Sequence, residues 1–166
     1  MAITSSTWAP ISEMGLAQAI NENSTTQKYK IGHRVKCRDT STQARGEAEF
    51  EYRGGIGSCL EGSVVCFDGD IVLLATTRSV GPVGIAMSAV EVSEYGWFQV
   101  AGNAKIKAVV SIADNAQLYT CGTAGSVDDA VVTGDMIHGA RSTSATDTGF
   151  ITAVINHPNC ADTNNS

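Results

Sequence analysis

Residues 91–112 read EVSEYGWFQVAGNAKIKAVVSI, and their pattern is the clearest indication of the fold class. In its second half, apolar side chains recur at every second position, as at Ala104, Ile106 and Ile112. This period of two is typical of a strand with one buried face. Gly102-Asn103 separates the halves and tolerates the positive φ of a tight hairpin turn. The stretch therefore predicts two antiparallel strands joined at Gly102-Asn103.

The first half of this stretch contains the densest aromatic group in the chain, Tyr95, Trp97 and Phe98. Three large rings so close together anchor either a core or a contact surface. Since Trp97 and Phe98 are neighbours on a strand, their side chains face opposite sides. We expect one of the two rings in the core and the other outward or against a partner. A platform for stacking sugars is the alternative interpretation.

The composition indicates a turn-rich β protein. The chain has 166 residues with 17 glycines and three prolines. Charged residues make up 17%, below the usual share of about 25%. Many glycines between short apolar runs favour an all-β fold, a small barrel or sandwich of about eight short antiparallel strands.

The chain is expected to divide into three parts: an extended N-terminal arm at residues 1–26, a β-rich domain at 27–156 and a flexible C-terminal tail at 157–166. In the arm, Ser12 is suited to cap a short helix that ends near Asn21. Trp8 favours burial, and therefore an arm docked on a protein surface.

Within the β-rich part, residues 46–53 (GEAEFEYR) alternate cleanly. Three apolar side chains point one way, and Glu47, Glu49 and Glu51 point the other way, toward solvent or a basic partner. Asp68-Gly69 predicts a hairpin turn between strands at residues 63–67 and 71–76. Further strands are expected at residues 29–38, 85–92, 117–121, 127–132, 136–140 and 150–155.

Charge and hydropathy exclude several kinds of partner. The net charge is −6 and no cluster of Lys and Arg occurs, so neither nucleic acid nor a membrane surface is expected as a partner. The apolar runs are too short to cross a bilayer, and the N-terminus does not resemble a secretory signal. Synthesis and folding in a cytosol are expected. The five cysteines are then reduced, small apolar residues, with a Cys59–Cys66 bridge left open.

No motif for catalysis or for a cofactor stands out. The segment Gly54–Ser58 is rich in glycine, but it lacks the lysine of a phosphate loop and is expected to be a turn. His157 and Cys160 have no second pair to complete a zinc site, and the loop carboxylates do not follow a calcium-loop pattern. The expected protein is not an enzyme and has no metal and no cofactor.

Several segments together resemble a known family. They are STTQK (24–28), GEAEFEY (46–52), GPVGIA (81–86), EYGWFQV (94–100), DNAQLY (114–119) and AGSVDDAVVTGD (124–135). In this order they are similar to capsid decoration, or cement, proteins of tailed bacteriophages, which are small β-rich structural proteins encoded near the major capsid protein. The resemblance covers residues 24–155.

The resemblance implies a structural protein on the capsid surface of the virion, made in the cytoplasm of the bacterial host. It would bind the major capsid protein, stabilise contacts between capsomers and form a homo-oligomer, a dimer or a trimer. Contacts are expected at Trp8, Tyr95, Trp97 and Phe98, and Trp8→Ala is expected to weaken capsid binding without unfolding the domain. The alternatives are a virion-surface module that binds a host receptor or glycan, and a hydrolytic enzyme.

Overall fold

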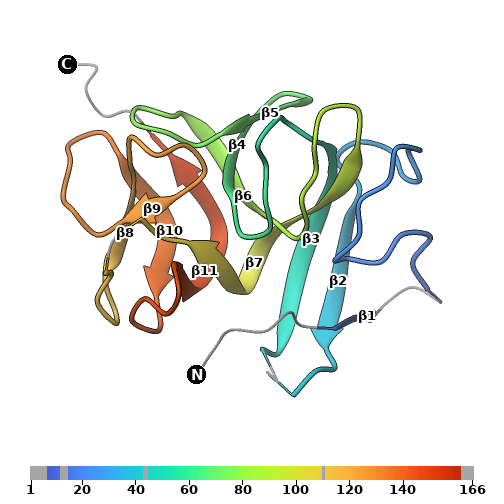
Figure 1. Cartoon of the computed structure of the whole chain (residues 1–166). Coiled ribbons are helices and arrows are strands. Elements are labelled where there is room, and N and C mark those ends of the chain that lie inside the picture. Colours follow the sequence, from blue (N-terminus) through green and yellow to red (C-terminus); the bar gives the residue numbers. More distant parts are fainter. Residues whose placement is uncertain (1–6, 12–14, 43–44, 110, 162–166) are drawn as a thin grey trace.

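The computed structural model describes residues 7–11, 15–42, 45–109 and 111–161, and every regular element in them is a β-strand (Figure 1). The strands are Trp8–Pro10 (β1), Arg34–Asp39 (β2), Glu47–Gly54 (β3), Val64–Asp68 (β4), Ile71–Leu74 (β5), Gly81–Ala86 (β6), Tyr95–Lys107 (β7), Gln117–Thr120 (β8), Val127–Asp128 (β9), Met136–Ser142 (β10) and Phe150–Cys160 (β11). The all-β prediction is confirmed, with more strands than expected and with two long ones, β7 and β11.

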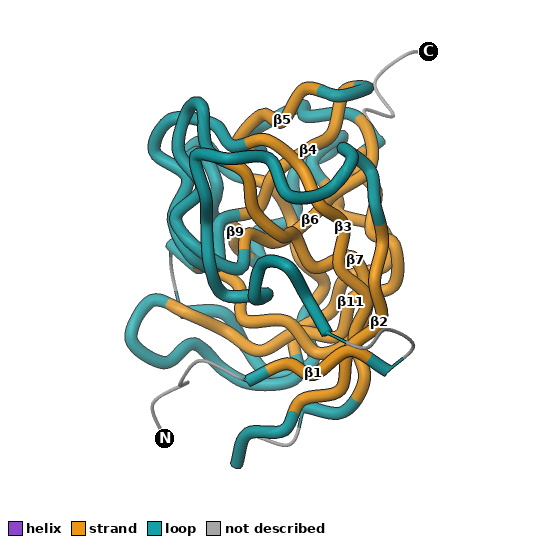
Figure 2. Tube along the Cα trace, turned by 90° about the vertical axis from the view of Figure 1, so that its right-hand side faces the viewer, coloured by secondary structure: helices purple, strands orange, loops and turns teal. Residues whose placement is uncertain are grey.

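The strands form one open antiparallel sheet in the order β1-β2-β3-β7-β6-β11-β10-β8-β9, and β4 adds to β6 and carries β5. In Figure 1, β2 and β3 stand on one side of the molecule, β8 to β11 lie on the other, and β7 crosses between them. The view along the other direction shows the β4–β5 hairpin at one end and β1 near the other (Figure 2). The sheet is not closed into a barrel, and its folding back on itself is consistent with a sandwich.

The predicted hairpin at Gly102-Asn103 is wrong, because β7 runs without interruption from Tyr95 to Lys107. Its residues 95–101 pair with β3, and its residues 101–107 pair with β11. Gly102 has a φ of +101° at the point where β7 changes partner, so it bends the strand and does not reverse it. The predicted alternation is confirmed at Ala104 and Ile106, which are both buried.

The described residues form three apolar cores. The largest lies among β4, β6, β8, β10, β11 and the second half of β7. A second core lies between the β3 face of Ala48, Phe50 and Tyr52 and the N-terminal segment. A third lies on the other side of β7, where the β4–β5 hairpin packs on Phe98 and Val100. Because β4 is buried on both faces, it separates the first core from the third.

The N-terminal segment is docked on the sheet. Strand β1 pairs with β2, and the Trp8 ring lies edge-on to Phe50 with 4.9 Å between ring centroids. Ile20 is also buried in this core. The helix expected from Ser12 to Asn21 is absent from its described part, residues 15–21, which forms bends and turns. Position 12 itself lies outside the described residues.

The predicted flexible tail is wrong for residues 157–160, because β11 continues to Cys160. Pro158 and Cys160 are buried there, and Asn159 pairs with Pro82 of β6. The side chains of this segment help to cover the largest core, which gives them a reason to be ordered. Residues 162–166 of the predicted tail lie outside the described residues.

The other strand predictions differ from the structure mainly at their ends. The strand at 46–53 and the hairpin at Asp68-Gly69 are confirmed as β3 and as the β4–β5 turn. The strand expected at 85–92 lies earlier, at Gly81–Ala86. Residues 87–94 instead form a loop that brings Val90 into the third core. The carbonyls of Val90 and Glu94 accept the N–H groups of Ile56 and Gly55, which confirms that the segment from Gly54 to Ser58 is a structural turn.

All five cysteines are buried and none is bridged. Cys59 belongs to the third core and Cys66 to the first, so the two thiols lie in different cores. This placement excludes the Cys59–Cys66 bridge that the sequence left open.

Candidate functional site

The most distinctive surface feature lies where β6, β7 and β11 meet. Strand β11 pairs with β7 as far as Asn156 opposite Ala101, and with β6 from Asn159 opposite Pro82. Strand β6 pairs with β7 only near its end, where Ile85 lies opposite Gln99. The three strands therefore join pairwise and leave a gap between their pairings. A cavity of about 210 Å³ opens at this junction.

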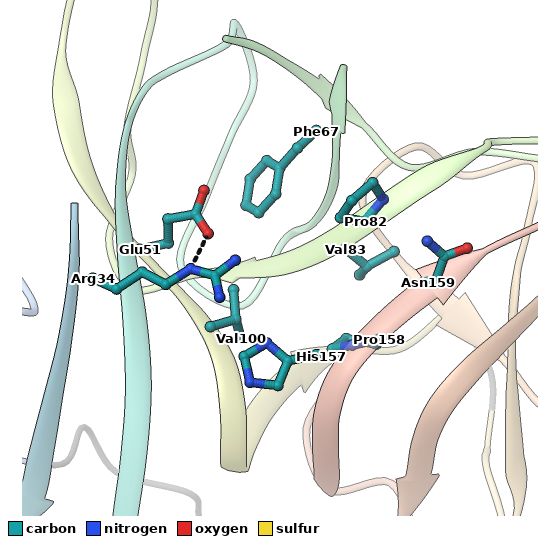
Figure 3. A pocket seen from close by; sticks show the side chains of 9 residues that line it. All are labelled: Arg34, Glu51, Phe67, Pro82, Val83, Val100, His157, Pro158 and Asn159. Atoms are coloured by element: carbon teal, nitrogen blue, oxygen red, sulfur yellow. Dashed lines mark hydrogen bonds and ion pairs between the residues drawn. The ribbon is translucent and has the colours of Figure 1, made fainter. Parts of the chain in front are cut away.

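The cavity has an apolar floor and a polar rim (Figure 3). The floor consists of Phe67, Pro82, Val83, Val100 and Pro158, and the rim consists of Arg34, Glu51, His157 and Asn159. In Figure 3 the Arg34 side chain extends over Val100, with Glu51 on one side and His157 on the other. The residues come from six strands, β2, β3, β4, β6, β7 and β11, so only the complete fold assembles this site.

Two further hollows, of about 310 and 190 Å³, adjoin the cavity on the outer face of β2 and β3. They share His157 and Arg34, respectively, with the cavity, and they share Lys36 and Glu49 with each other. We call the three hollows together the junction groove. It is lined by the nine cavity residues and by Val35, Lys36, Glu47, Ala48, Glu49, Ala101 and Asn156.

One wall of the groove is a ladder of opposite charges. In the antiparallel pairing of β2 with β3, Arg34 lies opposite Glu51, Lys36 opposite Glu49 and Arg38 opposite Glu47. Directly opposed unlike charges stabilise such a strand pair. The Nε of Arg34 donates to Glu51 at 2.8 Å, and the Nη2 of Arg38 donates to Glu47 at 3.0 Å. The basic partner of the glutamate row is thus part of this same chain.

Glu51 differs from the solvated carboxylate that the sequence predicts. Its side chain is only 3% exposed, and it also accepts a hydrogen bond from the Nε of Arg53 at 2.7 Å. The Arg53 guanidinium in turn lies 4.2 Å from the centre of the Phe67 ring. The expectation of a solvent-facing row is therefore wrong for Glu51, because the β4–β5 hairpin covers this end of β3. Two arginines compensate the buried charge.

The exposed side of the ladder is richer in cations than its sequence suggests. Arg34 and Arg38 have side chains 53% and 66% exposed. Glu47, the partner of Arg38, is 59% exposed, whereas Glu49 is 18% exposed and Glu51 is 3% exposed. Glu49 approaches Arg34 at 3.6 Å and the Nε2 of His157 at 3.7 Å. Among the described residues, Lys36 has no ion-pair partner although it lies opposite Glu49. Its ammonium is therefore free to contact a ligand.

His157 occupies a strained position beside this lysine. Its φ is +43°, in the left-handed region, at the point where β11 leaves β7 for β6. A residue other than glycine holds such a conformation only where the surrounding structure enforces it, and such residues cluster at ligand-binding sites. The His157 ring is 46% exposed and lines two of the three hollows.

The residues that the sequence assigns to a contact surface lie elsewhere. Trp97 and Phe98 face opposite sides of β7, as predicted, but both are fully buried, one in the second core and one in the third. The expectation that one of them points outward is wrong, because both faces of this half of β7 are covered. The Trp97 Nε1–H donates to the carbonyl of Gln18 at 3.0 Å, within the docked N-terminal segment.

Trp8 and Tyr95 pack on the same core as Trp97. Trp8 is 8% exposed, and the half-buried ring of Tyr95 stacks on Tyr52 with 6.3 Å between centroids. The structure thus brings three of the four predicted contact residues into one core and places Phe98 in another. None of the four lines the junction groove, and their role at an interface stays a prediction.

Sequence reasoning missed the groove residues, although one signal for the charged wall was present. The segments RVKCRD and EAEFEYR have opposite charges at alternate positions, which favours pairing between them. No comparable signal marks His157, which the sequence placed in a tail. Its position in the groove depends on pairing with two strands more than fifty residues earlier.

The groove has the properties of a binding surface for a group that carries a negative charge beside an apolar part.

In the part of the chain that the structure describes, no three His, Cys, Asp or Glu residues are placed to hold a metal ion. Burial raises the pKa of the Cys59 thiol to about 11, so this cysteine is a poor nucleophile at neutral pH. The described residues contain no helix able to span a membrane.

The fold of this chain resembles that of a phage protein of known structure. No protein-family model matches the sequence, and no curated protein matches it. A solved structure of bacteriophage phi29, the N base of head fiber gp8.5, has a similar fold with a TM-score of 0.51. The superposition covers 66% of this chain and 95% of that chain, at 12% sequence identity. At this identity the similarity shows a shared fold.

Proposed function

We propose that this chain is a structural protein of a tailed-bacteriophage virion, located on the outside of the head. The observation that supports it most is the shared fold, because the similarity spans 95% of a chain whose name places it in a phage head fiber. The resemblance of residues 24–155 to phage decoration proteins points to the same class by a separate route. Fold alone does not determine function, so the proposal depends on both together.

More specifically, we propose that the protein decorates the capsid by binding the major capsid protein where capsomers meet. Many modest contacts repeated over a shell produce strong attachment through avidity, and they require no catalytic group. The proposal gives the chain no enzymatic role. Association into a dimer or a trimer would multiply the contacts. Of the four contact residues predicted from sequence, Tyr95 retains a partly exposed side chain and is the one retained here.

A second candidate is a module that binds a receptor or a glycan of the host from the virion surface. The junction groove supports the receptor-binding form of this candidate, because an apolar floor with a few convergent polar groups is typical of ligand sites. Binding of the isolated protein to an array of bacterial surface glycans would favour the module over the decoration protein.

The protein composition of purified virions tests the proposal. A decoration protein should be present in hundreds of copies per particle, in a constant ratio to the major capsid protein on a stained gel. A matched infection with a phage that lacks the gene gives the control lane. A few copies per particle, or absence from purified particles, would contradict decoration.

A further inference from the structure

We propose that the junction groove binds an extended segment of another protein that carries a carboxylate next to an apolar side chain. The carboxylate would lie among Arg34, Lys36 and His157, and the apolar side chain would enter the cavity floored by Val83 and Val100. This inference names the kind of partner for the function proposed above and rests on it only for the biological setting. The binding itself depends on the groove alone.

The charges of the groove favour an anion. Lys36 has no ion-pair partner among the described residues, and the guanidinium of Arg34 is half exposed at the rim. The nearest carboxylates already have cationic neighbours. Glu51 is buried between two arginines, Glu49 lies 3.6 Å from Arg34, and Glu47 pairs with Arg38. The cations therefore extend beyond their partners toward solvent. On a chain with a net charge of −6 this is an unusual surface.

The size of the cavity favours a side chain over a free small molecule. Its volume of about 210 Å³ is below the range of about 300–1,000 Å³ that is usual for small-molecule sites. Its floor contains two prolines, two valines and Phe67, which offer apolar contacts and few hydrogen-bonding groups. One aliphatic side chain of a bound segment fits this description.

Other anionic partners fit the groove less well. A nucleic acid presents a row of phosphates and binds through clusters of Lys and Arg, and this chain has no such cluster. A sugar would need an exposed aromatic face, and the aromatic ring on the floor, Phe67, is buried. One of its contacts is the Arg53 guanidinium, and another is the edge-on ring of Phe98. An acidic, partly apolar protein segment needs neither a basic cluster nor an exposed aromatic ring.

A peptide titration of the isotope-labelled full chain tests this inference. The probes are two blocked tetrapeptides, acetyl-Glu-Val-Glu-Val-amide and acetyl-Gln-Val-Gln-Val-amide, followed by the amide chemical shifts of the protein. The Glu peptide should shift the amides of Lys36, Val83, Val100 and His157 at about millimolar concentration, and the shifts should shrink as salt is raised. The Gln peptide should bind at least about tenfold more weakly.

Two variants with the same change in charge complete the test. Lys36→Glu should weaken binding of the Glu peptide at least about tenfold. Lys28→Glu should leave it unchanged, because the N–H of Lys28 donates to the hydroxyl of Tyr52, on the β3 face opposite to Glu51.

Three results would overturn the inference: no shifts with the Glu peptide, equal binding of both peptides, or equal binding of glucuronate or inorganic phosphate at the same amides. All of them are measured without virions. A protein absent from phage heads could still bind the peptide, and a true decoration protein could fail to bind it.

Discussion

Glu51 is the side chain on which the charged face of β3 depends. It is buried, yet it carries a charge that only Arg34 and Arg53 compensate. Glu51→Gln keeps the shape but leaves two cations without their counter-charge, so we expect the free energy of unfolding to fall by about 2 to 4 kcal/mol. Urea denaturation, followed by tryptophan fluorescence, measures this loss.

Glu47→Gln is the matched control on the same strand. Glu47 pairs with Arg38, and both side chains are more than half exposed, so solvent screens the interaction and the expected loss is below about 0.5 kcal/mol. Equal losses in the two variants would show that the burial of Glu51 has no energetic consequence.

The Cys59 thiol links stability to alkaline pH. Burial raises its pKa from 9.0 to about 11, so the folded state holds its proton more tightly than the unfolded state does. The stabilisation is therefore complete below pH 9 and is lost as the pH rises to about 11. With 1.36 kcal/mol per pKa unit, the loss from this group reaches at most about 2.7 kcal/mol.

Urea denaturation in the presence of a reductant, at about pH 8 and about pH 10.5, measures the effect. Burial also raises the pKa of Tyr52, which acts in the same direction. Cys59→Ala should therefore lower the stability at both pH values and reduce, but not abolish, the difference between them. The same pH difference in the variant and in the original chain would contradict the role of Cys59.

At single residues, the sequence predicted the facing of side chains better than their exposure. Alternation correctly placed Trp97 and Phe98 on opposite sides of a strand and Glu51 opposite to Phe50. Exposure depends on what covers each face, and the covering segments come from far along the chain. The β4–β5 hairpin buries both Glu51 and Phe98. The local sequence around these two residues does not indicate that the hairpin covers them.

Among the strands, β7 shows why a correct local signal led to a wrong element. Gly102 does adopt a positive φ, as the hairpin prediction requires. The partner of the following residues, however, is β11, with Asn103 opposite Val154. Strand pairing is decided by distant segments, whereas turn propensity is local. The same limitation hid the C-terminal part of β11, which pairs with β6 and β10.

The bend at Gly102 gives a sharp prediction. A Cβ at this position would lie 2.7 Å from the carbonyl oxygen of Glu47 and 2.9 Å from the Cβ of Ala48. The backbone is also in a region that side chains disfavour, with a φ of +101°. Gly102→Ala should therefore lower the free energy of unfolding by about 2 kcal/mol or more. Thermal or urea denaturation measures the change.

Gly122→Ala is the control, since its Cβ meets nothing within 4 Å and its φ is not in the left-handed region. It should change the stability by less than about 0.5 kcal/mol. A Gly102 variant as stable as the Gly122 variant would show that the bend is not constrained.

Strand β1 ties the N-terminal segment to the second core through Trp8. Because this ring packs on Phe50 and is nearly buried, Trp8→Ala should cost about 3 kcal/mol of stability. The expectation from sequence that Trp8→Ala weakens capsid binding without unfolding the domain stays a prediction, to which this loss of stability is added. Ile11→Ala, just beyond β1, removes a side chain that is 48% exposed and should cost well under half as much. Calorimetric melting of both variants compares the two losses of stability. Equal melting temperatures of the two variants would refute a structural role for Trp8.

The described strands form one open sheet, in which the two long strands β7 and β11 each change their pairing partner along their length. Because β7 pairs first with β3 and then with β11, it joins the two halves of the sheet, and the junction groove lies where these halves meet. Composition and periodicity were enough to predict the all-β class, because strand formation leaves a pattern in the local sequence. They were not enough to predict the groove, which residues of six strands line together. A similar fold in a phage head-fiber base makes the outside of a phage head the proposed location.

Cryo-electron microscopy of phage heads, with and without this gene product, tests that location most directly. The difference map should show β-rich density on the outer surface of the shell, repeated at equivalent positions between capsomers and matching the fold in Figure 1. Identical maps of the two kinds of head, or extra density confined to the tail, would contradict it.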